Sequence, residues 1–273
     1  MLLILFLMTG LLFAEGDFAT VKEVASKLMD KNSVIIDARP AKSYKKVHIR
    51  NSVNIPISEL STDEPVEGML KSKEEISKIL GKHGVSPDKN IYIYCTKGNS
   101  AGRMYWILKM MGAQNVKLLD GNMDAWKAGR KPVTRNPTMV RKASFPAEMN
   151  SESLVTLNDV KAKMGSALLV DARKESYFNG TDPKSKGHIK GAIGIPSEMM
   201  LNEDGLLKSA DELKKLFDSK GVTKDKEVIL YCQSATRAGL LYNVLTSVLN
   251  YPDVKVYDGA YNEWIAKGNA VVN

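Results

Sequence analysis

The sequence predicts an α/β protein built from two tandem domains, each a parallel sheet covered by helices. Strand-like and helix-like segments alternate along the 273 residues, which is the pattern of parallel strands joined by helical crossovers. A series of short motifs also occurs twice in the same order. Two domains of about 125 residues lie within the usual size range, and each can bury a core.

The first repeated motif is a strand that ends in Asp-Ala-Arg. The apolar run at residues 34–36 leads into Asp37 and Arg39, and the run at residues 168–170 leads into Asp171 and Arg173. Short apolar runs of this kind are typical of buried parallel strands. We expect each Asp–Arg pair to form a local ion pair and loop hydrogen bonds rather than to act as an acid or base.

The next segments repeat a histidine motif and a helix. His48-Ile49 returns as His188-Ile189, and each motif is followed a few residues later by Ile-Pro. We expect both histidines to bond to the backbone, with proton transfer as the alternative. Helix-like segments follow at residues 72–83 and 209–219.

Each repeat then contains one cysteine at the end of an apolar run. Cys95 follows residues 91–94 and precedes Thr-Lys-Gly-Asn-Ser, and Cys232 follows residues 228–231 and precedes Gln-Ser-Ala-Thr-Arg. The pattern predicts a buried strand, a tight loop and the start of a helix. A thiol held there faces backbone N–H groups and the positive end of a helix, which favour the thiolate.

An Asp-Gly pair followed by a tryptophan closes each repeat. Asp120-Gly121 precedes Trp126, and Asp258-Gly259 precedes Trp264. We expect the tryptophans to pack helices onto the sheets. The aspartates that end the first motif lie 134 residues apart (37 and 171), and the cysteines lie 137 apart (95 and 232). Markers in one order at nearly one offset indicate a duplicated domain.

The repeats predict a first domain at residues 17–133, a linker at 134–152 and a second domain at 153–273. The linker region contains Pro137 and Pro146 but little periodicity. We expect it to lie on the surface, with Val140 and Phe145 docked, because it has too few Gly and Ser residues for a free tether.

The N-terminus predicts export. Residues 1–14 carry no charged side chain, and residues 2–13 are almost entirely apolar. This length suits a secretory signal peptide cleaved after Ala14 better than a membrane span. The mature protein is then periplasmic. An uncleaved N-terminal membrane anchor is the alternative, because no Lys or Arg precedes the apolar run, and a buried helix is a third interpretation.

Export bears on how the two cysteines are interpreted. An even cysteine count in an oxidising compartment suggests a disulfide, but a bridge here would require two separate loops to abut. Inert buried thiols are a second alternative, although the polar loops with glycine and arginine argue against it. Metal binding lacks a paired cysteine spacing, and the chain has only three histidines. We therefore expect neither a metal nor a cofactor.

The charge of the chain favours anionic partners. There are 39 Lys and Arg residues against 31 Asp and Glu, a net charge of +8. Such a field raises the encounter rate of anions. The lysines are scattered, without the basic stripe or aromatic platform of nucleic-acid-binding proteins, so we expect no nucleic acid partner.

The ordered motifs resemble the rhodanese family over residues 17–272. The second half matches best, in Asp171-Ala-Arg173, Gly187-His188-Ile189 and Tyr231-Cys232. Its extra segment at residues 179–186 is typical of the C-terminal half of two-domain thiosulfate and mercaptopyruvate sulfurtransferases. The first half departs from the pattern at Val47 and Asn51, where the family usually has glycine. The resemblance implies two tandem rhodanese-like domains.

The resemblance also implies the reaction. A cysteine thiolate takes the outer sulfur of an anionic donor as a persulfide, and a second nucleophile removes it. Thiosulfate is the expected donor, with mercaptopyruvate or polysulfide as further candidates. Cyanide or a small thiol is the expected acceptor, and a protein acceptor is also considered.

The expected catalytic residues are Cys232 first and Cys95 second, because two-domain members commonly use the C-terminal cysteine. Backbone N–H groups of each loop are expected to hold the persulfide, and Lys97 and Arg237 to attract the donor. Gly98 can adopt positive φ, whereas Ala235 at the same place either avoids positive φ or carries strain. The expected substrate-binding residues are Lys97, Gly98, Asn99 and Ser100 in the first loop, and Gln233, Ser234, Ala235, Thr236 and Arg237 in the second.

Three other functions are considered. A phosphatase of related fold would use a Cys-(x)5-Arg loop, whereas only four residues separate Cys232 from Arg237. An exported carrier could pass persulfide sulfur to a respiratory partner protein. A purely structural tandem would be expected to have lost its cysteines, and this chain keeps both.

Overall fold

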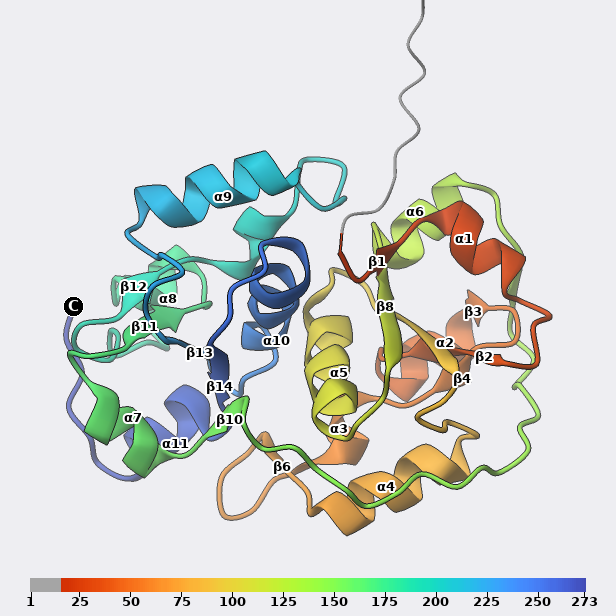
Figure 1. Cartoon of the computed structure of the whole chain (residues 1–273), viewed down its shortest axis with the longest axis horizontal. Helices are drawn as coiled ribbons and strands as arrows, with labels where there is room; N and C mark the ends of the chain where they lie inside the picture. Colours follow the sequence, from red (N-terminus) through yellow and green to blue (C-terminus); the bar gives the residue numbers. More distant parts are fainter. Residues whose placement is uncertain (1–15) are drawn as a thin grey trace, which may run out of the picture.

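The computed structural model describes residues 16–273, which form two α/β domains side by side (Figure 1). The first domain contains β1 (Phe18–Ala19), α1 (Val21–Ser26), β2 (Ser33–Asp37), α2 (Ala41–Lys46), β3 (His48–Ile49), β4 (Val53–Asn54), α3 (Ile57–Leu60), β5 (Ser61–Thr62), β6 (Met69–Leu70), α4 (Lys73–Lys82), β7 (Asn90–Tyr94), α5 (Asn99–Met110), β8 (Asn115–Leu119), α6 (Asn122–Ala128) and β9 (Val133–Thr134).

The second domain follows the same plan. It contains β10 (Leu154–Val155), α7 (Leu157–Lys163), β11 (Leu168–Asp171), α8 (Glu175–Phe178), β12 (Ile193–Gly194), the 3-10 helix η1 (Ser197–Met200), α9 (Ala210–Ser219), β13 (Val228–Tyr231), α10 (Ala238–Asn243), the π-helix η2 (Val244–Val248), β14 (Val254–Tyr257) and α11 (Ala260–Ala266).

Each domain is organised around a five-stranded parallel sheet. The strand orders are β1-β8-β7-β2-β4 and β10-β14-β13-β11-β12, and the two orders correspond strand for strand. All pairings within these sheets are parallel. The predicted fold class is therefore confirmed. Parallel strands must be joined by crossover connections, and here helices form these connections and cover the faces of the sheets.

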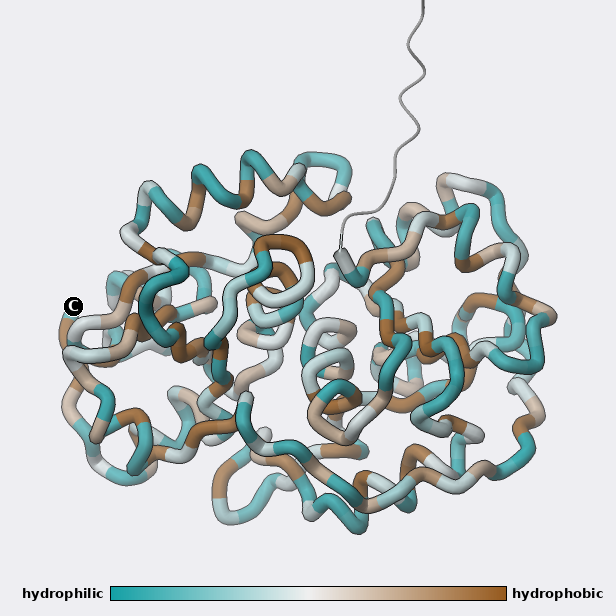
Figure 2. The backbone as a smooth tube through the Cα atoms, viewed as in Figure 1, coloured by the Kyte–Doolittle hydropathy of each residue, from teal (hydrophilic) through white to brown (hydrophobic). Residues whose placement is uncertain are grey.

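Hydrophobic burial follows the strands and continues between the domains. Figure 2 shows apolar stretches along the central strands, whereas α9 on the outside is mostly hydrophilic. One cluster of buried side chains joins the two domains, and it includes Trp106 from α5 and Leu240 from α10. A second cluster, which includes Trp126, lies under α1 and α6 of the first domain.

The two predicted helices at 72–83 and 209–219 are α4 and α9. Each begins with a capping box, in which Ser72 pairs with Glu75 and Ser209 pairs with Glu212. The serine side chain accepts a backbone N–H that the first helical turn leaves unpaired, and the glutamate does the same for the serine N–H.

The domains meet where α5 and α10 cross. A β-carbon placed on Gly102 would lie 2.4 Å from the backbone nitrogen of Leu240, and one on Gly239 would lie 2.5 Å from that of Arg103. No larger residue fits at either position. The two glycines therefore let the helix backbones touch, which fixes the domains against each other.

The connection between the domains runs along α4 (Figure 1). Residues 135–153 contain no helix or strand. The backbone N–H of Ala143 donates to the Gly81 carbonyl at 2.9 Å, and Phe145 is buried. Val140, expected to dock, is 40% exposed.

The predicted signal segment at residues 1–14 lies outside the described residues. Between residues 16 and 273, no helix combines the length and apolar character needed to cross a membrane. The described chain starts between the domains, where the Asp17 backbone N–H donates to Ser247 Oγ at 3.1 Å.

Candidate active site

Both cysteines lie at the carboxyl end of the central strand of their sheet. Cys95 follows β7 and Cys232 follows β13, and each strand is third in its sheet of five. This edge of an open parallel sheet is where ligands usually bind. Both residues are free thiols, so no disulfide joins the two loops.

The first cysteine loop (residues 95–100) wraps the Cys95 thiol in backbone amides. Those of Lys97, Gly98, Ser100 and Ala101 all direct hydrogen bonds to it. Gly98 adopts φ 83° immediately before α5, a conformation that glycine adopts without steric cost. The arrangement can hold a negatively charged sulfur without supplying a proton.

Burial nevertheless dominates at Cys95. The residue is only 3% exposed, and burial raises the pKa of its thiol above the usual value, because the amide hydrogen bonds offset the lost solvation only in part. The expectation that this position favours the thiolate is therefore wrong for Cys95. The same amides remain suited to hold a persulfide once it forms.

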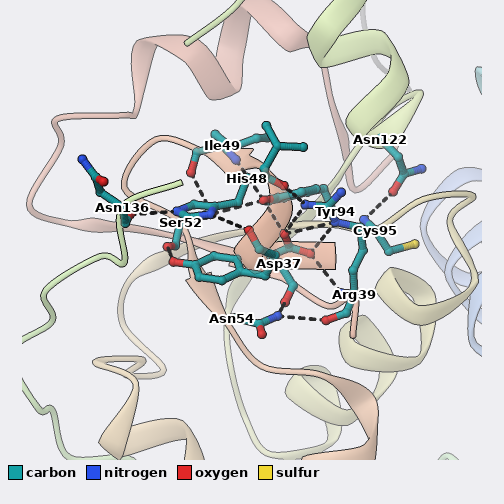
Figure 3. Close-up of polar contacts among 12 residues, drawn as sticks. Asp37, Arg39, His48, Ile49, Ser52, Asn54, Tyr94, Cys95, Asn122 and Asn136 are labelled. Carbon is teal, nitrogen blue, oxygen red and sulfur yellow. Dashed lines mark hydrogen bonds and ion pairs between the residues drawn. The ribbon is translucent and has the colours of Figure 1, made fainter. Parts of the chain in front are cut away.

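The first residue of α6 contacts the start of the first cysteine loop. The Cys95 backbone N–H donates to Asn122 Oδ1 at 2.8 Å (Figure 3). Asn122 begins α6 and has a positive φ of 54°. The sequence interpretation missed this contact, and only its place directly after Asp120-Gly121 could have indicated it.

The second cysteine loop (residues 232–237) is built alike. Cys232 is 1% exposed, and the Arg237 backbone N–H donates to its Sγ at 3.2 Å. Ala235 adopts φ 54°, so the loop keeps the positive φ of its counterpart and carries strain. A left-handed conformation costs a residue with a β-carbon about 1–2 kcal/mol.

The side chains of the loops differ in exposure. Lys97 is exposed and Arg237 is half-buried, directly before α10. Asn99 and Ser100 begin α5, and are half-buried. In the second loop, Ser234 Oγ and Thr236 Oγ1 lie 3.4 Å apart, and Gln233 Nε2 donates to Asn262 Oδ1 at 2.6 Å.

A buried ion pair supports each loop from the neighbouring strand. Arg39 pairs with Asp37 at 2.6 Å (Figure 3). Arg39 also donates to the Val47 carbonyl at 2.7 Å. Arg173 pairs with Asp171 at 2.7 Å. Tyr94 OH donates to Asp37 at 2.6 Å, which couples the pair to the residue before Cys95. The two Asp–Arg pairs therefore form the local ion pairs expected from the sequence.

The two repeated histidines contact backbone carbonyls, as expected, and the two repeated tryptophans are buried. Nδ1 of His48 donates to the Tyr44 carbonyl at 2.8 Å, and Nδ1 of His188 donates to the Phe178 carbonyl at 2.9 Å. Trp126 and Trp264 are buried. Within residues 16–273, no group of three His, Cys, Asp or Glu side chains is placed to hold a metal.

Each cysteine loop also faces a turn from the other domain, which the sequence interpretation missed. The first-domain hairpin (residues 61–70) lies against the second loop, where Asn262 Nδ2 donates to the Glu67 carbonyl at 3.1 Å. The second-domain turn (residues 201–207) lies beside the first loop, where the Leu207 N–H donates to Asp120 Oδ1 at 2.8 Å. The candidate site is therefore shared between the domains.

A cavity of about 320 Å³ separates the first cysteine loop from the second-domain turn. Thr96 and Lys97 line it on one side. Four acidic residues also line this cavity: Asp124, Glu198, Glu203 and Asp204. A single lysine therefore lies among several carboxylates beside the first cysteine loop.

Comparison with known proteins supports these observations. The family described as rhodanese-like domain matches residues 20–129 and again 156–267. The chain is 32% identical to the 3-mercaptopyruvate sulfurtransferase of Escherichia coli K12, covering 91% of this chain and 95% of the relative.

Other relatives carry different names. The chain is 31% identical to the thiosulfate sulfurtransferase of Rattus norvegicus, covering 83% of this chain and 80% of the relative. It is 32% identical to the sulfur carrier protein TtuD of Thermus thermophilus, covering 76% and 78%. The crystal structure of SseA from Escherichia coli, a 3-mercaptopyruvate sulfotransferase, superposes with a TM-score of 0.81 at 32% identity, over 90% of this chain and 99% of that one.

Proposed function

This chain belongs to the rhodanese family, and we propose that it moves sulfane sulfur from thiosulfate to a thiophilic acceptor through a cysteine persulfide. The observation that carries the proposal is the thiol at the end of each central strand, held among the N–H groups of its own loop. Such a loop stabilises an anionic sulfur while leaving it nucleophilic. The relatives named above are sulfurtransferases or a sulfur carrier.

The proposed reaction has two steps. The cysteine thiolate attacks the outer sulfur of thiosulfate, the S–S bond of the donor breaks, and sulfite leaves with the bonding electron pair. The persulfide then loses its outer sulfur to cyanide or to a small thiol, which regenerates the thiolate. With cyanide the product is thiocyanate, and neither step requires a metal, an oxidant or a reductant.

We assign the donor step to Cys232 before Cys95. Arg237 lies beside Cys232, and its backbone N–H contacts the sulfur. The cavity beside the first cysteine loop is lined by several carboxylates and one lysine, which disfavours the approach of a dianionic donor to that loop. The raised pKa of Cys95 also lowers its thiolate fraction. Mercaptopyruvate is the weaker candidate donor, because neither loop reads Cys-Gly-Ser-Gly-Val-Thr.

A sulfur carrier is the second candidate function, and the similarity to a sulfur carrier protein favours it. A carrier would form the same persulfide but would react slowly with cyanide and rapidly with a protein partner. We also propose that the protein works outside the cytoplasm, on the basis of the apolar segment at residues 1–14.

Thiocyanate production from thiosulfate and cyanide tests the proposal. We expect the parent protein to be active, Cys232→Ser to lose most turnover, and Cys95→Ser to keep a substantial fraction. The double variant measures the background. Absence of thiocyanate from folded parent protein contradicts the enzyme assignment, and an active Cys232→Ser with an inactive Cys95→Ser reverses the order of the two sites.

A further inference from the structure

The two cysteine loops are covered to different extents by the opposite domain. Gly68 of the first-domain hairpin lies directly on the second loop, because a β-carbon at Gly68 would come within 2.5 Å of Ser234 Cβ. Gly205 takes the equivalent place in the second-domain turn, and a β-carbon there would meet nothing within 4 Å. The first-domain hairpin therefore touches the Cys232 loop. The second-domain turn does not touch the Cys95 loop in the same way, and a cavity lies between them.

Arg103 of α5 connects the hairpin to the second domain. It is fully buried. Its Nη2 donates to Asp258 Oδ1 at 2.5 Å and to the Gly68 carbonyl at 3.0 Å. The other carboxylate oxygen of Asp258 accepts the Leu70 N–H at 2.9 Å. One guanidinium and one carboxylate thus hold the returning side of the hairpin at Gly68 and Leu70.

The other half of the molecule lacks this connection. Leu240 stands in α10 where Arg103 stands in α5, since each lies eight residues after its cysteine. Asp120, the counterpart of Asp258, is held by the backbone N–H groups of Leu207 and Gly121. Asp120 therefore anchors the turn, but among residues 16–273 no guanidinium pairs with this carboxylate as Arg103 pairs with Asp258.

We propose that Arg103 is a positioning residue that holds the first-domain hairpin closed over the Cys232 loop, so that Cys232 admits small reagents and excludes larger ones that Cys95 accepts. For turnover, this proposal implies that the Cys232 site selects small sulfur donors, and that implication rests on the proposed function. Removing one partner of a buried ion pair leaves the other charge uncompensated. Loss of Arg103 therefore releases the hairpin without altering the second cysteine loop itself.

The test compares alkylation of one cysteine by a large and a small reagent. In a Cys95→Ser background, the rate with a bulky maleimide is divided by the rate with iodoacetamide, so that changes in thiol reactivity largely cancel. We expect Arg103→Leu to raise this ratio at Cys232 by about tenfold or more, because loss of one partner of a buried ion pair strongly destabilises the closed hairpin. Arg103→Lys, which keeps the charge near Asp258, should raise it less.

Two measurements separate this role from general loosening. The same ratio for Cys95, in a Cys232→Ser background, should not change with Arg103→Leu. Leucine already occupies the equivalent place in α10, so the substitution reproduces an arrangement that this fold accepts. An unchanged ratio at Cys232 in folded protein, or an equal rise at both cysteines, would overturn the proposal.

A matched glycine pair tests the hairpin if Arg103→Leu does not fold. Gly68→Ala and Gly205→Ala impose similar strain, because their φ angles are +95° and +76°, but only the first collides with the opposite cysteine loop. Gly68→Ala should raise the ratio at Cys232, and Gly205→Ala should leave the ratio at Cys95 unchanged. Equal ratios for Gly68→Ala and the parent would contradict the closed hairpin. The assay needs no sulfur transfer, so its result is independent of whether thiosulfate is the donor.

Discussion

The ionisation of each cysteine depends on two opposing effects. Burial disfavours the thiolate, and the backbone amides around the sulfur favour it. At Cys95 the backbone N–H groups favour the thiolate, but the residue is largely buried and the pKa of its thiol is raised. Burial acts on the charged form, which for a thiol is the deprotonated one. The strand-loop-helix pattern predicted the amides. The depth of burial depends on tertiary packing, in which Leu240 of the opposite domain lies close to Gly98, and it could not be predicted from the loop alone.

This balance predicts a pH dependence for Cys95. A raised pKa means that the thiolate fraction is small at neutral pH and grows as pH rises. In Cys232→Ser, we expect the rate of iodoacetamide alkylation at Cys95 to keep rising beyond about pH 8.5, the pKa of a free cysteine. A rate that levels off near neutral pH would show a lowered pKa instead.

The positive φ shared by the two loops predicts stability changes of opposite sign. Gly98→Ala should destabilise the protein by about 1–2 kcal/mol, because φ is 83° and the new β-carbon would lie 3.2 Å from Leu240 Cδ2. Ala235→Gly removes strain but adds unfolded-chain entropy, so it should stabilise by about 1 kcal/mol or less. Urea unfolding measures both, and destabilisation by Ala235→Gly would contradict the strained loop.

At the scale of elements, the crossing of α5 and α10 organises the molecule. Both helices start at a cysteine loop, and they touch through Gly102 and Gly239. The repeat made the two helices predictable, since each follows a strand and a polar loop. Their contact was not predictable, because nothing in a single repeat indicates which face of its helix meets the other domain.

A β-carbon at this crossing should force the domains apart. We expect Gly239→Ala to cost about 1–3 kcal/mol or more, the range for overpacking a tight contact, and to broaden or split the urea unfolding transition. Gly112→Asn, just past the end of α5, is the control, because nothing lies within 4 Å of an added β-carbon there. Gly239→Ala unfolding at the parent midpoint would contradict the close approach.

At the scale of the whole molecule, the duplication explains the fold. The proposed difference between the two cysteine sites comes from residues at which the two halves differ. The repeated motifs predicted both sheets, and the resemblance they support is confirmed by a family match in each half. The missed features are those in which the halves differ or meet. Arg103 stands where the second half has Leu240, and the first-domain hairpin covers the Cys232 loop, which is far away along the chain. The repeated motifs indicate neither feature.

The N-terminal segment carries a separate prediction. Residues 1–14 are uncharged and mostly apolar, which suits a cleaved signal. We expect the mature protein to begin near Glu15 and to be recovered in soluble form outside the cytoplasm. N-terminal sequencing of the protein from its natural host tests this, and Met1 retained on membrane-bound protein would support the anchor instead.

The central claim is that a cysteine of this chain carries sulfur as a persulfide. Mass spectrometry of the intact folded protein after thiosulfate, followed by peptide mapping under non-reducing conditions, tests it most directly. We predict the mass of one added sulfur atom, located mainly on Cys232, together with released sulfite and loss of the adduct on addition of cyanide. Folded protein with no added sulfur on either Cys232 or Cys95 would contradict the account.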